Sequence, residues 1–120
     1  MEITFNTQEL EAERLYASEI VRYELDCKLR IFKVYAVLDD IPELEFSKGF
    51  VYSLNMYSDF ITFCEDMYIL TPNNTANLER LIGTRVCVEL RKDSNGAFFI
   101  REIFIDNDYL NELFDRDYDI

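Results

Sequence analysis

The chain has 120 residues, 49% of them hydrophobic, and its 24 acidic and 12 basic side chains give a formal net charge of −12. We expect one domain, residues 1–120, because this length builds a single core and this apolar content excludes general disorder. The acidic excess disfavours nonspecific binding to DNA or to an anionic membrane and favours a basic partner.

Cysteine usage indicates the compartment. Cys27, Cys64 and Cys87 are odd in number and form no CxxC pair, which argues against a disulfide framework. The first residues are acidic and lack the basic and apolar regions of a secretory signal. The chain contains no run of about 18 apolar residues, so the sequence predicts no transmembrane helix. We therefore expect a cytoplasmic protein that contacts no membrane.

The first predicted element is a helix within an acidic N-terminal region, residues 1–19. Asn6 followed three residues later by Glu9 matches a capping box and predicts a helix over residues 7–17. Residues 20–38 then alternate between apolar and charged side chains, and the phase changes at Ile31–Phe32. A straight strand of this length would measure roughly 60 Å. The pattern therefore predicts a long first strand that is bent by a bulge there or broken in two.

Turn residues Asp39, Asp40 and Pro42 end this strand. Further strand is expected over residues 43–47 and, from a clear alternation, over residues 50–57. Residues 58–66 fit either a helix capped by Ser58 or a short strand, and residues 67–70 favour a strand. These segments complete the first half of a β-rich core, residues 20–105.

The second half of the chain carries stronger signals. Residues 75–82 predict a short helix that ends at Gly83. Residues 85–91 and 97–105 alternate on either side of Asn95–Gly96, which predicts a hairpin. Residues 107–114 predict a final helix. It begins an acidic C-terminal region, residues 106–120, whose last residues are expected to form a loose end.

Together these elements predict an α+β fold, mainly an antiparallel small β-barrel or curved sheet. Its helices are expected at the N-terminus, before the last hairpin and at the C-terminus. The element order resembles that of the OB-fold, a five-stranded, partly open barrel that often binds oligonucleotides. Because other α+β folds share this order, a different antiparallel α+β domain remains the alternative to an OB-like barrel.

Composition argues against an enzyme. The chain has no histidine and only three isolated glycines, so it lacks the usual general base, the commonest metal ligand and any glycine-rich phosphate loop. Glu24, Asp26 and Lys28 share one strand face with a spacing found in metal-dependent nucleases, but an upstream acid is missing. We expect no cofactor and no metal site. A closed cleft around these three residues would favour an enzyme instead.

The preferred hypothesis is a non-enzymatic, acidic protein-interaction module. Clustered carboxylates can imitate DNA phosphates and occupy a basic site on a nucleic-acid-binding enzyme, as phage antirestriction and anti-CRISPR proteins of similar charge and size do. The alternative for the acidic clusters is ordinary solubility charge. The candidate partner-binding residues are Glu9, Glu11, Glu13, Asp39, Asp40, Glu43, Asp115, Asp117 and Asp119.

A second hypothesis is an OB-like, single-stranded nucleic-acid-binding protein. Such proteins combine a basic groove with exposed aromatic side chains. The candidate nucleic-acid-binding residues are Arg30, Lys33, Arg91 and Arg101. The opposing interpretation is that Glu24, Asp26 and Glu89 alternate with these bases and form cross-strand pairs.

Overall fold

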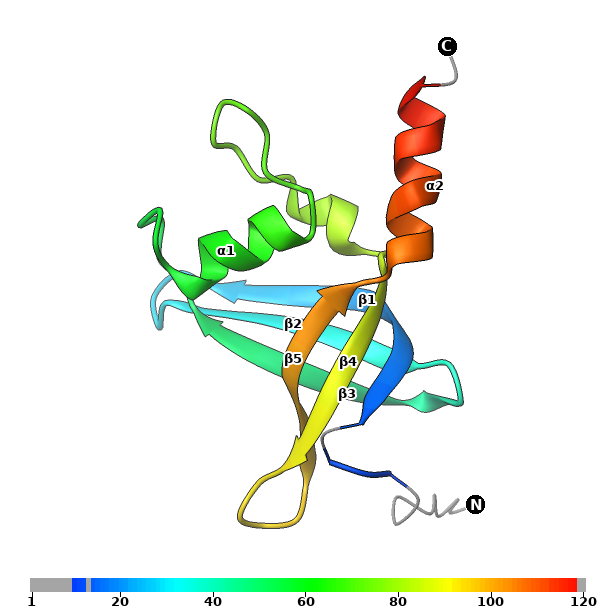
Figure 1. Cartoon of the computed structure of the whole chain (residues 1–120). Helices are drawn as coiled ribbons and strands as arrows, with labels where there is room; N and C mark the ends of the chain where they lie inside the picture. The colour runs from blue at the N-terminus through cyan, green and yellow to red at the C-terminus, as the bar shows by residue number, and fades with distance from the viewer. Residues whose placement is uncertain (1–9, 13, 119–120) are drawn as a thin grey trace.

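The computed structural model describes residues 10–12 and 14–118, and of residues 116–118 it describes the backbone only. Figure 1 shows an α+β fold with one curved antiparallel sheet of five strands. In chain order the elements are β1 (Leu15–Asp26), β2 (Ile31–Leu38), β3 (Ile41–Val51), α1 (Asp59–Asp66), the 3-10 helix η2 (Leu78–Leu81), β4 (Arg85–Lys92), β5 (Phe98–Ile105) and α2 (Asn107–Tyr118).

The strand order is β3-β2-β1-β4-β5. β1 is the central strand, and its first residues pair with β4 while its longer second part pairs with β2. The register shifts between Ile20 and Arg22, so Val21 is the extra residue of a bulge, which bends a strand and increases its twist. This bend allows one long strand to take part in both halves of the curved sheet.

The two edge strands, β3 and β5, approach each other because the sheet curves around from the central strand β1. The ammonium group of Lys48 on β3 donates a hydrogen bond to the backbone oxygen of Arg101 on β5, at 2.5 Å. Within residues 10–12 and 14–118, however, no ladder pairs β3 with β5. The sheet is therefore open, and the barrel closure that the sequence suggested is not found.

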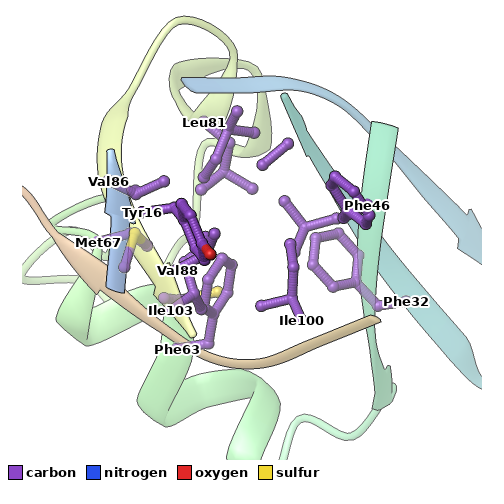
Figure 2. Close-up of a cluster of buried hydrophobic side chains, with 14 of the residues drawn as sticks. Tyr16, Phe32, Phe46, Phe63, Met67, Leu81, Val86, Val88, Ile100 and Ile103 are labelled. Carbon is purple, nitrogen blue, oxygen red and sulfur yellow. The ribbon is translucent and has the colours of Figure 1, made fainter. Parts of the chain in front are cut away.

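The core fills the concave side of the sheet. Figure 2 shows Phe32 and Phe46 from β2 and β3 and Ile100 from β5 pointing into one buried cluster. α1 covers an end of this cluster because its apolar residues repeat on one face, and the hydroxyl of Ser58 caps it by accepting the N–H of Ile61 at 3.2 Å. The ring of Phe60 lies 4.9 Å from that of Phe32.

The predicted N-terminal helix is wrong wherever the structure describes that segment. Residues 7–9 and 13 lie outside the description, residues 10–12 are not helical, and residues 15–17 belong to β1. There Tyr16 is buried between exposed Leu15 and Ala17, which is the alternation of a strand. Pairing with β4 overrides the local capping preference, so the β-rich part begins before residue 20.

Of the two alternatives for residues 20–38, the structure has the strand broken in two, and the single long bent strand is wrong. Residues 20–38 form two antiparallel strands joined by a turn at residues 27–30, so the phase change at Ile31–Phe32 marks the start of β2. The bulge lies ten residues earlier, at Val21. The strand expected over residues 50–57 ends at Val51, since the chain there turns away from the sheet to enter α1.

Other expectations are confirmed or settled. Residues 58–66 take the helical alternative as α1. Residues 67–70 do not form the expected strand, since Tyr68 has a positive φ of 59°, and only Leu70 forms an isolated bridge, with Ala76. The hairpin around Gly96 and the C-terminal helix both form, and α2 continues to Tyr118 where a loose end was expected. Of the short helix expected over residues 75–82, only the 3-10 helix Leu78–Leu81 forms. In the described part of the chain, no helix is long and apolar enough to cross a membrane.

Candidate protein-interaction surface

An open hollow of about 560 Å³ lies where the end of α1, strand β5 and the start of α2 meet. We call it the acidic–aromatic hollow. Its lining combines two carboxylates with two large rings that are both 49% exposed, Tyr68 and Phe104. The lining residues are Glu65, Asp66, Tyr68, Ile103, Phe104, Ile105, Asn107 and Leu110.

The local backbone places Tyr68 in this hollow. Met67 and Ile69 are both buried, so the residue between them faces outward. Tyr68 has a positive φ, and its N–H donates to the backbone oxygen of Glu65 at 3.0 Å, which tightens the chain after the helix. The ring of Phe114 on α2 meets the Tyr68 ring edge-on at 5.7 Å. This contact ties α2 to the end of α1.

Phe104 enters the hollow by strand alternation. Ile103 is buried and Phe104 follows it on the outer face of β5, opposite Cys87 of β4. The first turn of α2 borders the hollow through Asn107 and Leu110. Asp106 fixes the start of this helix, because one of its carboxylate oxygens accepts the N–H groups of Asp108 and Tyr109 at 2.9 and 3.1 Å. A carboxylate at this position also favours the helix dipole.

The hollow is acidic. Glu65 and Asp66 are exposed, and neither forms an ion pair among the residues that the structure describes. A neighbouring hollow of about 380 Å³ extends this surface and includes Asp59, Asp66 and Glu102. Exposed aromatic rings beside unpaired carboxylates suit a partner that presents basic and apolar side chains together.

Those of the predicted acidic residues that the structure describes do not form one cluster. Asp40 is exposed in the β2–β3 turn, Glu43 is exposed near the start of β3, and Glu11 is exposed before β1. Asp115 is exposed two turns along α2, which projects away from the sheet (Figure 1), and Asp117 lies in the same helix. Glu9, Glu13 and Asp119 lie outside the described residues.

Asp39 is already paired within the molecule. Its two carboxylate oxygens accept hydrogen bonds from two nitrogens of Arg85, one of them at 2.9 Å. The Arg85 guanidinium holds the pKa of Asp39 below its ordinary value. This bidentate pair ties the β2–β3 turn to the start of β4, so Asp39 has a structural use that the sequence did not reveal.

The predicted basic residues fall in two groups. Arg30 lies in the β1–β2 turn, and Lys33 on β2 lies opposite Glu24 of β1. Arg101, on β5, pairs with Glu89 at 3.2 Å, and Arg91 is exposed on β4. Part of the expected cross-strand pairing is therefore present.

On the outer face of β1, β2 and β3, charged and aromatic side chains contact one another. The guanidinium of Arg22 lies 3.6 Å from the centre of the Tyr35 ring and pairs with Glu24 at 2.7 Å and Glu45 at 2.9 Å. The Tyr35 hydroxyl donates to Glu24 at 3.0 Å. A ring covered by its own arginine does not offer an open stacking platform.

Within the part of the chain that the structure describes, no closed cleft forms around Glu24, Asp26 and Lys28. All three are exposed, and they line an open hollow at the β1–β2 turn. Asp26 instead accepts the N–H groups of Lys28 and Leu29, each at 3.0 Å. The described residues also contain no group of three or more His, Cys, Asp or Glu that could hold a metal ion.

The sequence did not identify the acidic–aromatic hollow. It lies partly in residues 58–70, where helix and strand patterns overlapped, and its parts come from three elements that are distant in sequence. A signal was present in the run from Met67 to Ile69, where an aromatic residue between two core residues must face outward. Comparisons with protein-family models, with curated proteins and with solved structures gave no match.

Proposed function

We propose that this protein is a non-enzymatic interaction module that binds a basic segment of another protein through the acidic–aromatic hollow. The observation that carries the proposal is the exposure of Tyr68 and Phe104 beside Glu65 and Asp66. Aromatic residues dominate the binding energy of many interfaces, and charge complementarity selects the partner. A net charge of −12 adds long-range attraction toward a basic protein.

The partner class that fits best is a cytoplasmic nucleic-acid-binding enzyme, with this chain as its inhibitor. Such enzymes bind phosphates through grooves lined with Lys and Arg. An acidic surface seated there excludes the nucleic acid by competition, without catalysis by the inhibitor. Asp115 is exposed on α2, the helix that also lines the hollow, and is a further contact in this proposal, whereas Asp40 and Glu43 near the β2–β3 turn are not part of it.

The test measures binding of labelled peptides of about 12 residues by fluorescence anisotropy, at protein concentrations that cover the dissociation constants of weak interfaces. We expect a repeating Arg-Leu-Ser peptide to bind, and the Arg-Ser-Ser and Glu-Leu-Ser peptides to bind at least about tenfold more weakly. Glu65→Lys with Asp66→Lys removes the binding. The matched control, Asp40→Lys with Glu43→Lys, makes the same charge change on the β2–β3 turn and retains it. Equal loss in both variants would show that only net charge matters.

The second candidate function is OB-like binding of single-stranded nucleic acid. It is favoured by the strand order, by a central β1 shared between two halves of the sheet, and by a helix between β3 and β4 beside approaching edge strands. Titration with labelled single-stranded DNA at low salt tests it. Saturable binding that Arg30→Glu with Lys33→Glu abolishes would replace the first proposal.

A further inference from the structure

The turn between β1 and β2 carries the opposite kind of surface from the acidic–aromatic hollow. We call it the hairpin-tip surface: exposed apolar side chains lie beside the bases Lys28, Arg30 and Lys33. Two carboxylates also line it, Glu24, which pairs with Arg22, and Asp26, which accepts N–H groups of the turn. Leu29, Val51 and Leu54 are 69%, 71% and 70% exposed. The apolar residues of this surface are Leu25, Cys27, Leu29, Ile31, Val51 and Leu54.

This surface is built and held by specific contacts. Asp26 fixes the turn through the N–H groups of Lys28 and Leu29. Arg30 has a positive φ of 55°, and its backbone oxygen accepts the N–H of Tyr52 at 2.8 Å. The segment that follows β3 is therefore tied beside the turn, and two open hollows of about 640 and 380 Å³ lie on either side of it.

The exposed apolar residues of the hairpin-tip surface lie outside the hydrophobic core. Single exposed apolar residues are ordinary, but a contiguous group marks a contact surface. Lys28 and Arg30 are exposed and form no ion pair among the residues that the structure describes. In a chain of net charge −12, a basic and apolar surface is complementary to the chain's own acidic and aromatic one.

We propose that the hairpin-tip surface of one copy docks into the acidic–aromatic hollow of a second copy; this rests on the proposed function of that hollow. Lys28 and Arg30 meet Glu65 and Asp66, while Leu29 contacts the exposed rings. One molecule cannot make this contact with itself, because the tip lies near the start of α1 and the hollow lies at its end (Figure 1). The contact is therefore head-to-tail, and it builds a closed ring or an open chain according to the rotation between copies.

Overall repulsion between two acidic copies does not prevent this contact at moderate salt. The radius of gyration is 15.5 Å, so the charge centres of two docked copies are separated by more than the Debye length of about 8 Å at 0.15 M. Ion pairs at the contact itself lie within that length and are screened less. The self-association is thus local in origin and requires both surfaces.

Sedimentation equilibrium from about 10 µM to about 1 mM protein tests the proposal over the range of weak interfaces. The wild-type chain is expected to increase in mass with concentration. A tip variant, Lys28→Glu with Arg30→Glu, and a hollow variant, Glu65→Lys with Asp66→Lys, are each expected to stay monomeric. Mixing the two variants restores opposite charges at both kinds of contact, wild-type tip with wild-type hollow and reversed tip with reversed hollow, so the mixture is expected to associate although each variant alone stays monomeric. The control Asp40→Lys with Glu43→Lys associates like wild type.

A monomeric wild-type chain at the highest concentration overturns the proposal, as does a mixture of the two variants that remains monomeric. If the hollow still binds the Arg-Leu-Ser peptide in that case, the proposed function stands and only the self-contact is wrong. If neither occurs, both proposals fail. Binding of single-stranded DNA that the tip variant loses, without self-association, would assign the hairpin-tip surface to nucleic acid instead.

Discussion

Replacement of Phe32 by alanine tests the register of β2, and with it the position of the hairpin tip. Phe32 is 0% exposed, and its ring lies 4.9 to 6.2 Å from the rings of Tyr23, Phe50, Phe60 and Phe63. Removing a buried phenylalanine side chain costs about 3–5 kcal/mol of unfolding free energy, since the cavity does not fully collapse. Phe32→Leu removes fewer atoms and costs roughly 1–2 kcal/mol.

Ile31 is the matched control because it precedes Phe32 and faces the other side of the sheet. It is 38% exposed, so Ile31→Ala removes only partly buried methyl groups and costs about 1 kcal/mol. In urea, with a slope near ~1.5 kcal/mol per molar, the two alanine variants shift the midpoint by about 2–3 M and by less than about 1 M respectively. Circular dichroism during urea titration measures both shifts.

The ratio of the two costs carries the test. If β1 and β2 formed one continuous strand with the phase of residues 21–31, Ile31 would face the core at the bend. An Ile31→Ala cost equal to or greater than that of Phe32→Ala would refute the hairpin register, and the hairpin-tip surface would not exist as described. Phe32→Leu keeps the comparison possible if Phe32→Ala does not fold.

Four further predictions concern single contacts. Arg85 lowers the pKa of Asp39, so the pair stabilises the fold above the unfolded pKa of about 3.9 and is lost as pH falls through the folded pKa. The pair is partly exposed, and a double-mutant cycle of Asp39→Asn with Arg85→Gln should give about 0.5–1 kcal/mol at pH 7 and none near pH 2; a cycle independent of pH would contradict this. Burial raises the pKa of the Cys64 thiol to about 11, so a thiol reagent at pH 8 should label exposed Cys27 first and Cys64 only on unfolding, and equal native rates would exclude this core. Gly96 has a φ of 83°, and Gly96→Ala should cost about 1–2 kcal/mol in a urea titration, whereas no cost would mean another turn type. Arg30 has a left-handed backbone conformation that glycine adopts without strain, so Arg30→Gly should raise the free energy of unfolding by between about 0 and 1 kcal/mol. The same change should weaken self-association, and a clear loss of stability would count against the turn geometry.

The parts of the fold that the sequence predicted are those with strong local signals. The β4–β5 hairpin follows from alternation around Asn95–Gly96, and the end of η2 follows from Gly83, which has a φ of 88°. The N-terminal helix failed because a local capping pattern competed with pairing of residues 15–19 against β4, a contact between residues about 70 positions apart. A break within residues 20–38 was one alternative, but the position of the β1–β2 turn at residues 27–30 was not predicted because these residues include neither Gly nor Pro.

The candidate site was harder to predict because it too depends on contacts between residues that are distant in the sequence. Its carboxylates were counted in the sequence, but the sequence does not show which acids remain exposed. Asp39 was assigned to partner binding and is paired with Arg85, whereas Glu65 and Asp66 were not assigned and line the hollow. Both outcomes depend on which strands and helices meet, and that depends on long-range packing rather than on local pattern.

Backbone strain links the two proposed surfaces. Among the described residues, Arg30, Tyr68 and Asn74 are the non-glycine residues with positive φ. Asparagine tolerates this conformation, whereas for arginine and tyrosine it costs about 1–2 kcal/mol each. Strained residues persist where the surrounding structure fixes them, and they concentrate at binding sites. Arg30 holds the turn of the hairpin-tip surface and Tyr68 presents its ring in the acidic–aromatic hollow, so the two costly positions coincide with the two surfaces that their charge makes complementary.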